Sequence, residues 1–143
     1  MTTATKITVK ATVNAPISEV WEAWNDPNDI MQWNAADPSW YCPASENNLS
    51  VGGKFKHRME AKDGSFGFDF EGQYEKVEPL QEISYAMSDG RKVNTWFAAE
   101  NGTTTITSTF DAETENELEM QKQGWQAILE NFVRYISAKG SNN

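Results

Sequence analysis

The sequence predicts an α+β fold in which a curved antiparallel sheet of six strands wraps around a long C-terminal helix. Three observations lead to this prediction: one alternating strand pattern followed by two short helical segments, five further strand candidates joined by tight turns, and one long amphipathic segment. The sheet and the last helix would each have one apolar face, and each face can bury the other. We expect residues 1–143 to form a single domain, with its core at about 6–138 and short flexible ends.

The N-terminal part alternates between apolar and polar residues from Lys6 to Val13, which is typical of a half-buried strand. Ser18 is a suitable N-cap for a short helix that runs through Trp24. Asp26 and Pro27 should end that helix, and Pro27 can occupy the first turn of a second one. Two short helices are therefore expected directly after the first strand.

The segment from residue 34 to residue 53 is rich in turn-forming residues and is expected to be irregular. A loop of this length is uncommon inside a compact domain, and such loops are often functional. Trp40 and Tyr41 lie within it, and they would either anchor the loop or act as a lid over a bound molecule. Anchoring is the favoured interpretation, because exposed aromatic side chains are costly unless they are packed.

The five strand candidates after residue 53 are separated by strong turn signals at Asp63-Gly64, Asp89-Gly90 and Asn101-Gly102. Alternating runs joined by such turns predict an antiparallel meander. Alternation places Phe66, Phe68 and Phe70 together on the inner face. It holds through Tyr74 and slips at Val77, which indicates a bulge near Gly72 or beyond. The adjacent pair Trp96-Phe97 leaves the inner face of its strand ambiguous.

The last helix is expected to span residues 115–139, because apolar side chains recur along it at spacings of three and four. Acidic residues load its first turns and basic residues lie near its end, as the helix dipole favours. Gly140 is expected to end the helix in a left-handed conformation. Gly124 lies in the helix interior, where it either leaves room for close approach by another element or a ligand, or is a tolerated defect.

The composition excludes several classes of partner. The net charge is −9 and the twelve basic residues are scattered, which argues against nucleic acids and against adhesion to anionic membranes.

Cys42 is the single cysteine, so no internal disulfide is possible and a reducing compartment is favoured. No signal peptide or membrane-spanning apolar run is recognisable, so we expect a cytoplasmic protein without membrane insertion.

Short motifs along almost the whole chain follow one order and spacing. They are Ala15-Pro16, Val20-Trp21, Trp24, Asp26-Pro27, Gln32-Trp33, Val51-Gly52-Gly53-Lys54-Phe55, Met59, Phe70-Glu71-Gly72-Gln73-Tyr74, Glu78-Pro79, Ile83-Ser84-Tyr85, Gly102-Thr103-Thr104 and Gly124-Trp125. In this arrangement the chain resembles the activator of Hsp-90 ATPase homologue-like family. That family belongs to the START-like (SRPBCC, birch-pollen-allergen-like) superfamily of helix-grip folds.

The resemblance implies a cavity between the sheet and the long helix, which in related proteins takes lipids, polyketides, sterols or flavonoid-like molecules. We favour binding or carriage of such a small hydrophobic molecule. A protein–protein module that modulates a chaperone ATPase is the first alternative, and a cyclase or hydrolase-type enzyme that uses the same cavity is the second. Fold similarity does not choose among them.

Aromatic residues are abundant, with six Trp, seven Phe and four Tyr, and they suit either an ordinary core or the wall of a ligand cavity. The candidate cavity residues are the apolar side chains on the expected inner faces together with three polar ones that would orient a ligand. They are Trp21, Trp24, Met31, Trp33, Trp40, Phe55, His57, Met59, Phe66, Phe68, Tyr85, Met87, Trp96, Ser108, Trp125, Leu129 and Phe132.

The sequence shows little catalytic chemistry. His57 is the single histidine, and it is either a general acid or base in the cavity or a hydrogen-bonded core residue. Cys42 and His57 cannot complete a zinc site, so we expect neither a metal nor a cofactor. Nothing in the sequence positions a serine beside His57, so no Ser-His-Asp constellation is expected and no catalytic residue is assigned.

Overall fold

The computed structural model of the protein describes residues 5–141, and the side chains of residues 5–139. The elements in chain order are β1 (Lys6–Val13), α1 (Ile17–Asn25), α2 (Pro27–Trp33), β2 (Trp40–Asn47), β3 (Lys54–Ala61), β4 (Gly67–Glu78), β5 (Glu82–Met87), β6 (Lys92–Glu100), β7 (Thr103–Asp111) and α3 (Leu118–Ser141). The prediction of flexible ends falls largely on residues outside this range.

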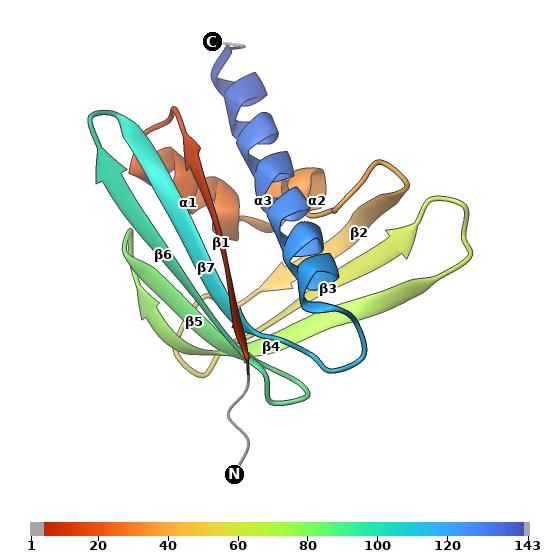
Figure 1. Cartoon of the computed structure of the whole chain (residues 1–143). Coiled ribbons are helices and arrows are strands. Elements are labelled where there is room, and N and C mark those ends of the chain that lie inside the picture. The colour runs from red at the N-terminus through yellow and green to blue at the C-terminus, as the bar shows by residue number, and fades with distance from the viewer. Residues whose placement is uncertain (1–4, 142–143) are drawn as a thin grey trace.

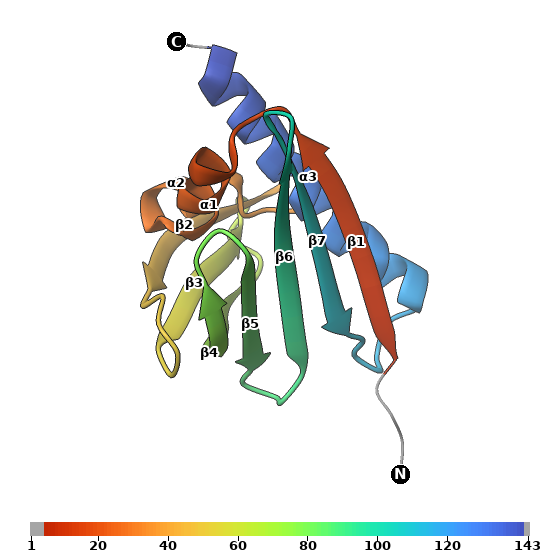
Figure 2. The ribbon, with the colours of Figure 1, turned by 90° about the vertical axis from the view of Figure 1, so that its left-hand side faces the viewer.

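One curved sheet contains all seven strands, in the order β1-β7-β6-β5-β4-β3-β2, and every neighbouring pair is antiparallel. Helix α3 lies across the concave face of this sheet (Figure 1). Helices α1 and α2 lie together near one end of the strands (Figure 2). The predicted architecture, a bent sheet that wraps around the last helix, is confirmed.

The number of strands is a correction, because the structure has seven where the sequence predicts six. The additional strand is β2, which lies within the segment expected to be irregular and forms the edge of the sheet beside β3. Pro43 lies inside it, where the register shifts between Tyr41 and Ala44. Proline cannot donate a backbone hydrogen bond, but an edge strand with a bulge tolerates it. The strand is therefore stabilised by its neighbour rather than by its own propensity.

The meander of β3 to β7 is confirmed, together with its turns. Gly64, Gly90 and Gly102 have φ values of 77°, 94° and 81°, which place them in the region that favours glycine. The bulge expected at or beyond Gly72 occurs between Tyr74 and Lys76 in the pairing of β4 with β5.

The helix ends differ in part from expectation. Asp26 caps α2 by accepting a backbone N–H, and Pro27 occupies the first turn, as predicted. The N-cap of α1 is Pro16 rather than Ser18. Helix α3 begins at Leu118 rather than at residue 115, and it continues through Gly140 to Ser141, so the predicted left-handed end at Gly140 is wrong.

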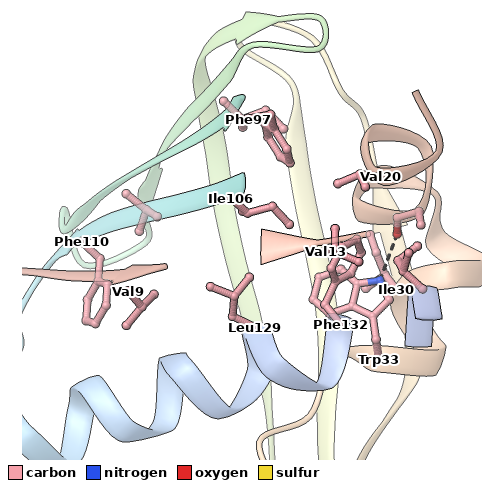
Figure 3. Close-up of a cluster of buried hydrophobic side chains, with 14 of the residues drawn as sticks. Val9, Val13, Val20, Ile30, Trp33, Phe97, Ile106, Phe110, Leu129 and Phe132 are labelled. Carbon is pink, nitrogen blue, oxygen red and sulfur yellow. Dashed lines mark hydrogen bonds between the residues drawn. The ribbon is translucent and has the colours of Figure 1, made fainter. Parts of the chain in front are cut away.

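Part of the hydrophobic core lies between α3 and the strands β1, β6 and β7. Phe132 of α3 and Ile106 of β7 are completely buried. In Figure 3, Leu129 and Phe132 project from α3 toward Ile106 and Val13. Trp33 packs edge-on against Phe132, with ring centroids 4.9 Å apart. Trp24 of α1 packs against both rings, so side chains of α1, α2 and α3 meet at this end of the sheet.

Candidate functional site

A cavity of about 280 Å³ lies between the inner face of the sheet and α3. Its wall includes residues from both short helices, from β3 to β7 and from the middle of α3. Most of these side chains are apolar or aromatic, and the polar ones are few. Phe68 lines the cavity and is also 41 % exposed, so the wall reaches the molecular surface at this residue.

Ten of the seventeen predicted cavity residues line this space. They are Trp24, Trp33, Phe55, His57, Met59, Phe68, Tyr85, Ser108, Trp125 and Leu129. They come together because strand alternation and helix periodicity turn one face of each element toward the same interior. Their role in binding a ligand stays a prediction.

The structure places the other seven predicted residues elsewhere. Phe132 and Met87 are buried core residues, Trp21 packs on Phe97, Met31 and Trp40 line a separate pocket near β2, and Phe66 and Trp96 are exposed.

Trp96 and Phe66 lie outside the cavity wall for different physical reasons. Phe97 is 6 % exposed and points inward, so its neighbour Trp96 must lie on the outer face, where it is 40 % exposed. Phe66 precedes β4 in the turn after β3 and is 61 % exposed. Trp40 contacts Phe66 and Phe68 with ring centroids 6.0 Å apart in each case, so it anchors β2 to this hairpin.

Ten further residues of the wall were not among the predicted ones: Val9, Asn25, Ile30, Asn34, Asn47, Phe70, Tyr74, Ile83, Thr95 and Ile128. The alternation of β1, β4 and β5 carried the signal for Val9, Phe70 and Ile83. Asn47 could not be found this way, because its strand was not expected.

His57 extends from β3 into the cavity wall and is 9 % exposed. Its ring stacks on Phe55, with centroids 5.0 Å apart. Ser45 Oγ lies 2.9 Å from Nδ1, and no hydrogen bond joins Nε2 to another described residue. Burial lowers the pKa of His57 to about 4, so the ring is neutral at neutral pH.

The expectation that no serine lies beside His57 is wrong. Ser45 is the register partner of His57 in the pairing of β2 with β3, and the unforeseen strand brings it there. Ser45 does not line the cavity, and among the described residues no carboxylate hydrogen-bonds to the imidazole. The pair therefore lacks the third group that orients the histidine of a catalytic triad.

Two tyrosines in the wall differ in their partners. The hydroxyl of Tyr74 donates to Oδ1 of Asn47, whose amide donates in turn to the carbonyl oxygen of Asn25 at 2.7 Å. The hydroxyl of Tyr85 has no hydrogen bond to any described residue. Burial raises the pKa of both phenols, so both are neutral donors or acceptors.

Thr95 and Ser108 form a buried hydroxyl pair in the same wall. They are register partners on β6 and β7, and their side-chain oxygens lie 2.8 Å apart. Each hydroxyl keeps spare hydrogen-bonding capacity, because a hydroxyl can both donate and accept. Within residues 5–139, no group of three or more His, Cys, Asp or Glu side chains is placed to hold a metal ion.

The fold and the cavity together define a helix-grip protein of the START-like (SRPBCC) superfamily. The family model described as "Activator of Hsp90 ATPase homolog 1-like protein" matches residues 14–137, and the chain belongs to this family. Within the described part of the chain, no helix combines the length and apolar character that a membrane crossing requires.

Solved structures agree with this assignment. An AHSA1-like protein from Aeromonas hydrophila is 48 % identical, with a TM-score of 0.90 over 95 % of this chain and 94 % of that one. The protein Chr148 from Cytophaga hutchinsonii is 46 % identical, with a TM-score of 0.81 over 96 % of each chain. The protein NE0264 from Nitrosomonas europaea, 15 % identical over 95 % of this chain and 96 % of its own, has a TM-score of 0.81 and shares the fold. A search of the curated proteins finds no match.

Proposed function

We propose that this protein binds or carries a small hydrophobic molecule, of lipid, polyketide or flavonoid type, in the cavity between the sheet and α3. The observation that supports this function best is the cavity itself, which has about 280 Å³ of space behind a mainly apolar and aromatic wall. Small-molecule sites are typically concave, apolar spaces with a few placed polar groups.

Three polar positions in the wall would fix the orientation of such a molecule. They are Nε2 of His57, the hydroxyl of Tyr85 and the hydroxyl pair of Thr95 and Ser108. Aromatic rings such as Trp125 and Phe55 supply large apolar contact areas beside them. A ligand that matches both the aromatic rings and the polar positions would bury its apolar surface and still form hydrogen bonds with its polar atoms.

A titration followed by amide chemical shifts tests the proposal, with representative flavonoids, fatty acids and sterols. Binding should shift the resonances of wall residues on β3, β5 and α3 in a saturable manner. The variant Ile128→Trp fills part of the cavity and should abolish the shifts, because Ile128 lines it. The matched control is Val133→Trp, a half-buried position of the same helix outside the wall. Absence of saturable shifts with every class would contradict the proposal.

A second candidate is modulation of a chaperone ATPase, which the description of the matching family supports. The outer face of the sheet, where Trp96 is 40 % exposed, is the contact surface that we would assign to it. The test measures the ATPase rate of the host's Hsp90-type chaperone with this protein and with its Trp96→Ser variant. An unchanged rate with both proteins would remove this candidate, whereas an effect lost in the variant would support it.

A further inference from the structure

The wall of the cavity contains no charged side chain. Among the described residues that form it there is no Asp, Glu, Lys or Arg. Its titratable groups are His57, Tyr74 and Tyr85, and burial keeps all three in their neutral forms at neutral pH. A bound ion would therefore have no counter-ion in the wall.

Charge is expensive in such a site. Transfer of a carboxylate from water into a low-dielectric interior costs several kcal/mol unless a partner of opposite charge compensates, so such a group is instead neutralised or excluded. The net charge of −9 adds a long-range repulsion against anions. The cavity is thus unsuited to a fatty acid, a phosphate ester or a sulfonate in its ionised form.

Neutral oxygen groups, in contrast, find free partners there. Nε2 of His57 and the hydroxyl of Tyr85 have no hydrogen bond to any described residue, and both rings pack against Phe55, at centroid distances of 5.0 Å and 4.7 Å. Because Ser45 can donate to Nδ1 of His57 or accept from it, Nε2 can act as donor or as acceptor. A ligand hydroxyl or carbonyl suits either arrangement.

We propose that the cavity selects uncharged ligands whose hydroxyl or carbonyl oxygen hydrogen-bonds with His57 or Tyr85, and that it rejects anions of the same shape. This inference rests on the proposed binding function and narrows its ligand class. Among lipids, it favours alcohols and other neutral forms over ionised fatty acids.

The test compares ligand pairs that differ in charge but little in shape, namely decanol with decanoate and 2-naphthol with 2-naphthoate. Amide chemical shifts are followed near pH 7.5, where both acids are ionised and 2-naphthol is neutral. We expect the neutral member of each pair to bind at least about tenfold more tightly, which corresponds to about 1.4 kcal/mol. Equal or tighter binding of the anions would overturn this inference and leave the binding function intact. Binding of no compound, charged or neutral, would overturn both.

A designed gain of function provides a second test. Phe68 lines the cavity at its exposed edge, so Phe68→Lys can place a cation beside the ligand without burying it. This variant should bind decanoate several-fold more tightly than the unmodified protein does. The matched control is Phe66→Lys, which adds the same charge at a 61 % exposed position outside the wall and should leave decanoate affinity unchanged. The same gain in both variants would mean that overall charge, not the wall, governs selection, and would overturn the inference.

Discussion

The indole ring of Trp125 stacks on the phenyl ring of Phe110, with centroids 3.9 Å apart and ring planes 12° apart. Trp125 belongs to α3 and Phe110 to β7, so this contact holds the helix against that strand. Trp125 also forms part of the cavity wall. The same side chain therefore joins the helix to the sheet and shapes the space between them.

Removal of this contact should weaken the domain. We expect Trp125→Ala to lower the free energy of unfolding by about 3 kcal/mol, because it deletes a large ring and leaves a cavity beside Phe110. The control is Trp96→Ala, which removes the same side chain from the outer face and should cost about 1 kcal/mol or less. Urea unfolding followed by circular dichroism measures both. Equal losses would show that the stacking does not anchor the helix.

Replacement of Gly124 by alanine should stabilise the protein. A Cβ at this position would meet no atom within 4 Å, so close packing by another element does not explain the glycine. We expect Gly124→Ala to raise the free energy of unfolding by about 1 kcal/mol, which is the helix propensity difference. The opposite result is expected for Gly72→Ala, whose Cβ would lie 2.6 Å from two carbons of the Phe55 ring. Thermal unfolding of both variants checks the pair, and a loss of stability in Gly124→Ala would contradict the account.

The stability of the domain should depend on pH through His57. Burial lowers the pKa of this histidine to about 4 in the folded state, whereas its ordinary value is 6.5. As the pH falls through 6.5, the unfolded chain gains a proton that the folded protein does not accept. The neutral ring therefore contributes its full stabilisation above pH 6.5, and this contribution is lost progressively as the pH falls to about 4.

This pKa shift lowers the free energy of unfolding by about 3 kcal/mol between neutral pH and pH 4. Urea unfolding at a series of pH values should show this slope in the unmodified protein, and the variant His57→Gln should lack it. The carboxylates whose pKa values are lowered, such as that of Asp111, act at lower pH and remain in both proteins. An identical slope in the variant would rule out His57 as its cause.

The two tyrosines of the wall should separate stability from binding. Tyr74→Phe removes the donor to Oδ1 of Asn47 and should lower the free energy of unfolding by about 1 kcal/mol. Tyr85→Phe removes a hydroxyl without a described protein partner, so it should change stability little and instead weaken the binding of a hydroxyl-bearing ligand such as decanol. Unfolding and ligand titration of both variants test this division. A reversed pattern, with Tyr85→Phe the less stable variant, would contradict the hydrogen-bond assignment.

Much of the fold could be predicted from the sequence, because the alternation of β1 and β3 to β7, the Asx-Gly turns and the amphipathic α3 are local patterns. β2 could not be predicted. Its residues include Pro43 and several turn formers, and it is a strand only because the edge of β3 is available to pair with it.

The candidate site was predictable to the extent that it follows from alternation. Phe55, His57 and Met59 share one face of β3, and all three line the cavity. The partners of these residues were not predictable. Ser45 reaches His57 across the pairing of β2 with β3. Asn47 of β2 reaches Tyr74 of β4, although these two strands are not neighbours in the sheet. No local pattern encodes either contact.

By itself, the sequence determined the strands and helices other than β2 and the apolar faces of most of them, because periodicity is a property of neighbours along the chain. Only the tertiary structure decided that Phe97 rather than Trp96 faces inward, and that Phe132 fills the core while Trp125 borders a cavity. The physical reason is that burial depends on how far apart two packed surfaces lie, and that separation is set by the curvature of the whole sheet against one helix.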